Sequence, residues 1–157
     1  MNETTGQQAP HLDEMDEKVA HRFLTGLLSN LDPEEEYAAR HEDYVLEMPQ
    51  SGERIRGREN MRAFQRSYSS RSPSHPMRRI RVHLVMARDG LWVVEGAADY
   101  DERQALDVVV ISELRDGKMW RDTGYFAEPF EAPEWRSQWV ERMETGAPPR
   151  DERGDVG

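Results

Sequence analysis

Two Asp-Gly pairs, Asp89-Gly90 and Asp116-Gly117, constrain the fold more than any other feature of this chain. Each pair separates two runs in which apolar and polar residues alternate, which is typical of a two-residue hairpin turn between strands. A polar break at 101–103 separates the two hairpins from each other. We therefore predict that the second half of the chain forms consecutive antiparallel strands at 78–88, 91–100, 104–115 and 118–126.

The residues before these strands follow a helical period instead. Between Asp13 and Asn30 the apolar side chains recur three and four positions apart, which indicates a helix with one buried stripe. Asp32-Pro33 then supplies a capping side chain followed by a first-turn proline, so a second helix is predicted to run from there to about His41, with Tyr37 and Ala38 facing inward.

Shorter elements complete the pattern. The alternating run 44–49 ends at a proline and is followed by 53–56, which predicts a short strand and its return. Met61, Phe64 and Tyr68 recur at helical spacing and predict a third helix over 58–69. Beyond residue 132, Trp135 and Trp139 lie four apart and predict a short amphipathic helix.

Helices that precede a run of hairpins cannot serve as crossovers between parallel strands, so the fold class is α+β. The helices are then expected to cover one face of the sheet. When such a sheet curls, its concave face and the helices enclose a pocket that is lined by every second strand residue.

Composition limits the partners and the chemistry. The 157 residues suffice for one domain, which we place at 12–143 between tails at 1–11 and 144–157 that are expected to be disordered. The net charge of -10 disfavours nucleic acid and anionic membrane surfaces. Neither a secretion signal nor an apolar run of about 18 residues is present, and there is no cysteine, so a cytoplasmic location is expected.

Two stretches resemble a known family. HEDYVLEMPQSGERIRGRENMRAF and ISELRDGKMWRDTGYFAEPFEAPEWRSQWVERM are similar to the SnoaL-like branch of the nuclear-transport-factor-2-like superfamily. The resemblance implies a cone-shaped, curved antiparallel sheet wrapped by N-terminal helices, a cystatin-like α+β barrel. It also implies a small-molecule pocket between sheet and helices and, commonly, a homodimer formed through the outer sheet face.

The superfamily contains ketosteroid isomerase, polyketide cyclases, dehydratases, limonene epoxide hydrolase and non-catalytic binding or assembly subunits. The resemblance places the general-base position of the isomerase on Met48, its tyrosine near Phe23 and its protonated aspartic acid near Val110. The catalytic carboxylate of the epoxide hydrolase falls on Gly124. None of these side chains can transfer a proton, so neither reaction follows from the resemblance.

The same register predicts which strand residues face the pocket, and it brings three carboxylates together: Glu95, Asp99 and Asp122. Carboxyl groups among apolar side chains have raised pKa values, which suits acid/base catalysis. We predict these three as catalytic residues. The alternative is that each carboxylate is paired with an arginine of a neighbouring strand.

The residues predicted to contact the ligand are Tyr37, Met48, Phe64, Val93, Val110, Trp120 and Phe126. The opposite sheet face is predicted to carry an apolar band that a second copy would cover, giving a homodimer. The residues of this band are Trp92, Val94, Val109, Ile111, Thr123 and Tyr125.

The histidines show no HxH or HxxxH spacing, so we predict no metal site and no cofactor. Two functions stay open. One is an enzyme of the isomerase, cyclase or dehydratase type acting on a small apolar metabolite. The other is a non-catalytic ligand-binding or assembly subunit with the same fold.

Overall fold

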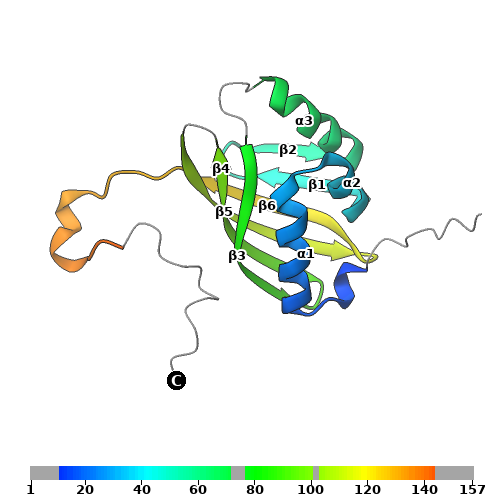
Figure 1. The fold of residues 1–157 in the computed structure, drawn as a ribbon, viewed down its shortest axis with the longest axis horizontal. Coiled ribbons are helices and arrows are strands. Elements are labelled where there is room, and N and C mark those ends of the chain that lie inside the picture. Colours follow the sequence, from blue (N-terminus) through cyan, green and yellow to red (C-terminus); the bar gives the residue numbers. More distant parts are fainter. Residues whose placement is uncertain (1–10, 72–76, 101–102, 144–157) are drawn as a thin grey trace, which may run out of the picture.

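The computed structural model of the chain describes residues 11–71, 77–100 and 103–143. It confirms the predicted order of helices and strands and the α+β class (Figure 1). The helices are α1 (Glu17–Asn30), α2 (Pro33–Ala39) and α3 (Arg58–Arg71), with 3-10 turns η1 (Leu12–Glu14) and η2 (Glu134–Trp139). The strands are β1 (Arg40–Met48), β2 (Glu53–Arg56), β3 (Met77–Arg88), β4 (Leu91–Tyr100), β5 (Arg103–Arg115) and β6 (Lys118–Ala127).

The strands form a six-stranded sheet in the order β2-β1-β6-β5-β4-β3. Neighbours are antiparallel, as predicted, except β1 and β6, which run parallel, so the sheet is mixed at this one pairing. The reason is the path of the chain. α3 carries the chain from β2 to the far edge, and the meander β3 to β6 then returns strand by strand until β6 lies beside β1 (Figure 1).

Local sequence signals act at the hairpin turns and at the start of α1. Asp89 and Gly90 have φ values of 49° and 76°, and Asp116 and Gly117 have 52° and 71°, as a hairpin turn of this type requires. The side chain of Asp16 accepts a hydrogen bond of 2.9 Å from the backbone N–H of Val19 and so begins α1.

α2 differs from its prediction in orientation and length. It buries Glu36 and Ala39, whereas Tyr37 is half-buried and Ala38 is exposed. It ends at Ala39 because Arg40 already belongs to β1. This shift places two charged residues, Glu36 and Arg40, on the buried side.

The helices cover one face of the sheet, with α1 packed on β3 and α3 on β1 and β2 (Figure 1). Trp92 is among the most deeply buried side chains, and its ring meets that of Phe23 edge to face at 6.4 Å between centroids. The placement of Trp92 and Val94 on the outer face is therefore wrong, since both belong to the core under α1.

The segment after β6 leaves the sheet and stands apart from the helices (Figure 1). Its predicted amphipathic helix is the 3-10 turn η2, on which Trp135 and Trp139 are each 72% exposed. The predicted tails 1–11 and 144–157 lie outside the described residues, apart from His11. No helix in the described part of the chain is long and apolar enough to cross a membrane.

Candidate functional site

A cavity of about 640 Å³ lies between the helices and the concave face of the sheet. This volume is within the usual range for small-molecule sites. Most of its lining is apolar and comes from every layer of the fold: Leu24, Leu27, Leu28, Leu31, Leu46, Met48, Met61, Phe64, Met77, Ile80, Val94, Val108, Val110, Met119 and Phe126.

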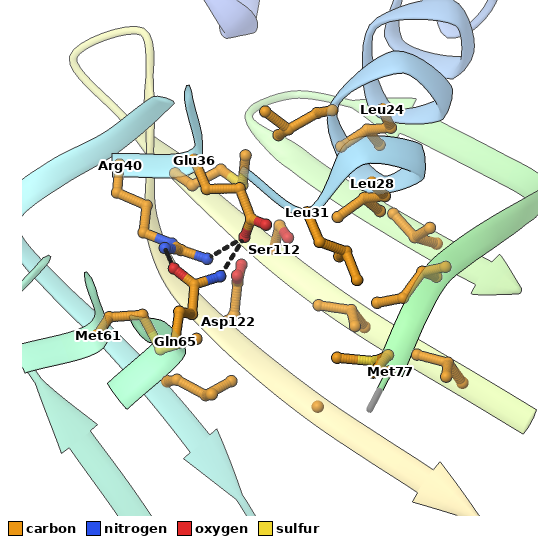
Figure 2. A pocket seen from close by; sticks show the side chains of 18 of the residues that line it. Leu24, Leu28, Leu31, Glu36, Arg40, Met61, Gln65, Met77, Ser112 and Asp122 are labelled. Atoms are coloured by element: carbon orange, nitrogen blue, oxygen red, sulfur yellow. Dashed lines mark hydrogen bonds and ion pairs between the residues drawn. The ribbon is translucent and has the colours of Figure 1, made fainter. Parts of the chain in front are cut away.

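The polar residues of the lining gather at one end. Figure 2 shows Glu36, Arg40, Gln65, Ser112 and Asp122 close together, with the apolar side chains of α1 and Met77 on the other side of the cavity. We call these five residues and Tyr44 the polar end. They come from α2, β1, α3, β5 and β6, so only the tertiary fold brings them together.

Asp122 is the carboxyl at the centre of this end. It pairs across the sheet with Ser112 on β5 and Leu46 on β1, and only 8% of it is exposed. The hydroxyl of Tyr44, itself 1% exposed, donates a 2.6 Å hydrogen bond to Oδ2. Oδ1 is buried and has no hydrogen-bond partner.

Burial raises the pKa of Asp122, because a carboxylate in an apolar cavity loses its hydration. The hydroxyls of Ser112 and Tyr44 and the charge of Arg40 oppose this rise without cancelling it. Burial and the neighbouring Asp122 in turn raise the pKa of the Tyr44 hydroxyl well above its usual value, so Tyr44 stays a donor. Asp122 is therefore shifted toward the pH range in which a carboxyl group can both give and take a proton.

Glu36, Arg40 and Gln65 form a closed network beside Asp122 (Figure 2). Arg40 Nη2 donates to Glu36 Oε2 at 2.5 Å, and Gln65 Nε2 donates to the same oxygen at 2.7 Å. Arg40 Nη1 donates to Gln65 Oε1 at 2.9 Å. Burial raises the pKa of Glu36, and the Arg40 charge opposes the rise. Two buried atoms of this network, Glu36 Oε1 and Arg40 Nε, have no hydrogen-bond partner.

The guanidinium of Arg40 also lies 4.9 Å from the centre of the Tyr44 ring, which connects the network to the Tyr44–Asp122 pair. Sequence reasoning missed Glu36, Arg40 and Gln65 as site residues. The one available signal was the four-residue spacing of Glu36 and Arg40, which is typical of exposed helix pairs as well.

The predicted inward parity holds for β5 and fails for β4. Val110 and Ser112 line the cavity, whereas in β4 the lining residues are Val94, Gly96 and Tyr100. Val93, Glu95 and Asp99 alternate with these and so lie on the outer face. The cause is Trp92, whose burial against α1 turns the even-numbered residues of β4 inward.

The pocket placement of Glu95 and Asp99 is therefore wrong. Glu95 pairs across the sheet with Val109, which is partly exposed. Asp99 forms ion pairs with Arg79 and Arg81 at 2.9 and 2.8 Å. This is the pairing with arginines of a neighbouring strand that the sequence predicts as the alternative to a catalytic carboxylate. Asp122 is the one of the three predicted carboxylates that lines the cavity.

Met48, Phe64, Val110 and Phe126 line the cavity as predicted, but Tyr37 and Trp120 do not. The Tyr37 hydroxyl donates to Glu59, and the ring stacks with Arg58 and Arg62 outside the cavity.

Trp120 is displaced by an irregularity in the β5–β6 register. Glu113 pairs with Arg121 and Leu114 with Met119, so Trp120 is the extra residue of β6 and Met119 faces the cavity instead. The guanidinium of Arg115 lies 4.4 Å from the centre of the Trp120 ring.

Met48, Val110 and Gly124, the positions that the resemblance equates with catalytic groups of the isomerase and the epoxide hydrolase, all line the cavity. They carry no proton-transfer group, so the acid/base capacity of the cavity resides in Asp122 and its neighbours. Among the residues the structure describes, no group of three or more His, Asp or Glu side chains is arranged to hold a metal ion.

Comparison with known proteins identifies the family. The model of the SnoaL-like domain matches residues 20–122. A solved NTF-2-like protein of unknown function from Burkholderia xenovorans is 35% identical, with 79% of this chain and 93% of that chain covered and a TM-score of 0.62. A candidate ketosteroid isomerase from Kribbella flavida is 28% identical, with coverages of 80% and 87% and a TM-score of 0.67.

A third structure, from Catenulispora acidiphila, has a ketosteroid isomerase-like fold and contains trimethylamine. It is 10% identical, with 68% of this chain and 85% of that chain covered and a TM-score of 0.56, so it shows the shared fold alone. No curated protein matches the sequence. The family model spans most of the chain, and solved structures of NTF-2-like proteins share its fold; the chain belongs to the SnoaL-like domain family.

Proposed function

We propose that this protein is a cofactor-independent acid/base enzyme, of the isomerase, cyclase or dehydratase type, acting on a small and mainly apolar metabolite. The observation that carries the proposal is Asp122. Its carboxyl group is buried at the polar end of an apolar cavity, Tyr44 holds one oxygen, and the other oxygen has no partner.

The roles follow from the contacts. Asp122 transfers the proton, since its raised pKa lets it act as acid or base nearer neutral pH. Tyr44 is a positioning residue that orients the carboxyl group through its hydroxyl. The apolar lining binds the body of the metabolite and keeps water away from the reacting atoms.

The experiment begins with native mass spectrometry of the freshly purified protein to find a retained small molecule. Turnover of that molecule is then compared among wild type, Asp122→Asn and Glu95→Gln. Asp122→Asn keeps the size of the side chain and is expected to lower kcat by about 10²–10⁴-fold. Glu95→Gln, the matched exchange on the outer face, is expected to leave kcat unchanged. Full turnover by Asp122→Asn would exclude this assignment.

A non-catalytic ligand-binding or assembly subunit is the second candidate. It is favoured by Met48 and Val110, which fill two positions of proton transfer in the isomerase with inert side chains inside the cavity. A retained molecule that wild type releases unchanged under all assay conditions would support this candidate.

We also propose a homodimer through the outer sheet face, supported by the exposed fractions of Val109 (37%) and Tyr125 (39%), which pair with each other across β5 and β6. The expected cytoplasmic location stays a prediction from composition.

A further inference from the structure

We propose that the ligand of this cavity carries an uncharged hydroxyl group at one end of an apolar body, and that this hydroxyl binds between Glu36, Arg40 and Asp122. The inference rests on the proposed function in one respect, because it concerns the same cavity. It goes further by naming the chemical class of the ligand and its orientation.

Unused hydrogen-bonding atoms gather at the polar end of the cavity. Three buried side-chain atoms at the polar end have no partner: Glu36 Oε1, Arg40 Nε and Asp122 Oδ1. Glu36, Arg40 and Asp122 all line the cavity, and the first two are 5% exposed, so a ligand group reaches the three enclosed atoms when these side chains rotate slightly on binding. A buried polar atom without a partner costs about 1–3 kcal/mol, so such atoms gathered at one cavity end indicate a ligand group that pairs with them.

These atoms match a ligand group that both donates and accepts hydrogen bonds. Arg40 Nε can only donate a hydrogen bond and Glu36 Oε1 can only accept one, so the ligand must do both. A hydroxyl donates one hydrogen bond, to Glu36 Oε1, and accepts two, from Arg40 Nε and from the protonated carboxyl group of Asp122. A ketone, an ether or a carboxylate only accepts and would leave Glu36 Oε1 unpaired. An ammonium only donates and would leave Arg40 Nε unpaired.

The charges at the polar end disfavour an anionic head group on the ligand. The positive charge of Arg40 is already matched by Glu36 at 2.5 Å and by the oxygen of Gln65 at 2.9 Å. A ligand carboxylate would therefore meet two carboxyl groups and a cation that is already paired, and it would lose its own hydration on entry. A neutral head group avoids both costs.

The remaining lining determines the orientation. Leu24 and Leu28 of α1, Leu31 directly after α1 and Met77 of β3 lie across the cavity from Glu36, Arg40 and Asp122 (Figure 2). The apolar body of the ligand fills that region, and its hydroxyl points to the network of Glu36, Arg40 and Gln65. The hydroxyl is then placed beside Asp122, where a proton can be exchanged with it.

The experiment measures binding of a matched probe set to the full chain by isothermal titration calorimetry at pH 7. The probes share a naphthalene body: 2-naphthalenemethanol, 2-methylnaphthalene, 2-acetylnaphthalene, 2-naphthoate and 2-naphthylmethylammonium. We expect the alcohol to bind about tenfold more tightly than the hydrocarbon, as one net hydrogen bond implies. The ketone and both ions are expected to bind more weakly than the alcohol.

Asp122→Leu removes the carboxyl oxygens and is expected to reduce the preference for the alcohol over the hydrocarbon. The matched control Asp99→Leu, on the outer sheet face, is expected to keep it. If Asp122→Leu does not fold, the wild-type probe order alone still decides.

Equal binding of alcohol and hydrocarbon would mean that water satisfies the three atoms, and it would overturn the proposal. Tighter binding of the ketone, the carboxylate or the ammonium than of the alcohol would overturn it too, as would the absence of binding by every probe. These results are independent of turnover. Loss of catalysis in Asp122→Asn together with a failed probe order would support the enzyme and refute the hydroxyl ligand. The expected probe order in a protein without turnover would support the hydroxyl ligand and refute the enzyme.

Discussion

Asp122 and Asp99 are both strand aspartates, and their surroundings move their pKa values in opposite directions. Burial raises the pKa of Asp122. On the outer face, hydrogen bonds from Arg81 at 2.8 and 2.9 Å, and a further one from Arg79, lower the pKa of Asp99 despite its partial burial. The same residue type therefore has a different proton affinity on each face of one sheet.

The raised pKa of Asp122 predicts that its contribution to the stability of the fold decreases as the pH rises. The folded protein binds a proton at Asp122 more tightly than the unfolded chain does, so the stabilisation is complete below the unfolded pKa of about 3.9. It is lost as the pH rises through the raised pKa of the folded state. Asp122→Asn cannot ionise, so its free energy of unfolding relative to wild type is expected to increase from pH 4 to pH 8, as measured by urea denaturation.

Asp99→Asn provides the control of opposite sign. The lowered pKa of Asp99 stabilises the folded protein above about pH 3.9, and this stabilisation is lost as the pH falls through the folded pKa. Asp99→Asn is therefore expected to be less stable than wild type at pH 7 and to approach it below pH 4. The same pH trend in both variants would contradict the two assignments.

At the scale of elements, β3 and β4 approach each other closely at Gly96. Gly96 pairs with Val82 where the register of β3 shifts before Leu84. A Cβ atom at Gly96 would lie 2.2 Å from the backbone carbonyl oxygen of Arg81. Gly96 also lines the cavity, so the close pairing of these strands shapes the site.

Gly96→Ala is therefore expected to destabilise the protein by about 1–3 kcal/mol, because a backbone atom cannot move aside as a flexible side chain can. Gly26→Ala is the matched exchange in α1, where a Cβ atom would meet nothing within 4 Å. It is expected to stabilise the protein by about 0.5–1 kcal/mol through helix propensity. Chemical denaturation measures both, and a tolerated Gly96→Ala would show that β3 and β4 can separate without cost.

At the scale of the whole molecule, exposed apolar side chains gather in two places. One is the outer sheet face with Val109 and Tyr125, and the other is the segment after β6 with Trp135, Trp139 and Met143. Because β6 leads from the first place into the second, a partner that covers the sheet face would also lie near the start of this segment.

For the proposed homodimer, Val109→Glu is expected to give a monomer in size-exclusion chromatography with light scattering. It puts a charge beside Glu95 and Tyr125 on the predicted contact surface, and the exposed position keeps the fold intact. Met143→Glu, at a position that is 90% exposed, is expected to leave the mass unchanged. A monomeric wild type would refute the dimer, and dissociation by Met143→Glu would assign the contact to the C-terminal segment.

The sequence by itself determined the elements of this protein and their order. The Asp-Gly pairs set the hairpin turns through positive φ, Asp16 and Asp32 cap their helices, and the spacing of apolar residues distinguishes helices from strands. These are local effects within a few residues, so they can be seen without any tertiary contact. The α+β class follows from this order.

The tertiary structure alone decided the inward face of β4 and the partners that surround Asp122. In β4 a shift of one residue would move every side chain to the other face of the sheet. The packing of Trp92 against Phe23 of α1, a contact between residues distant in the chain, determines which face points inward. The same kind of contact brings Glu36, Gln65 and Asp122 together from three separate elements. A buried polar group becomes reactive through partners that are distant in the chain, and local sequence patterns carry no information about such partners.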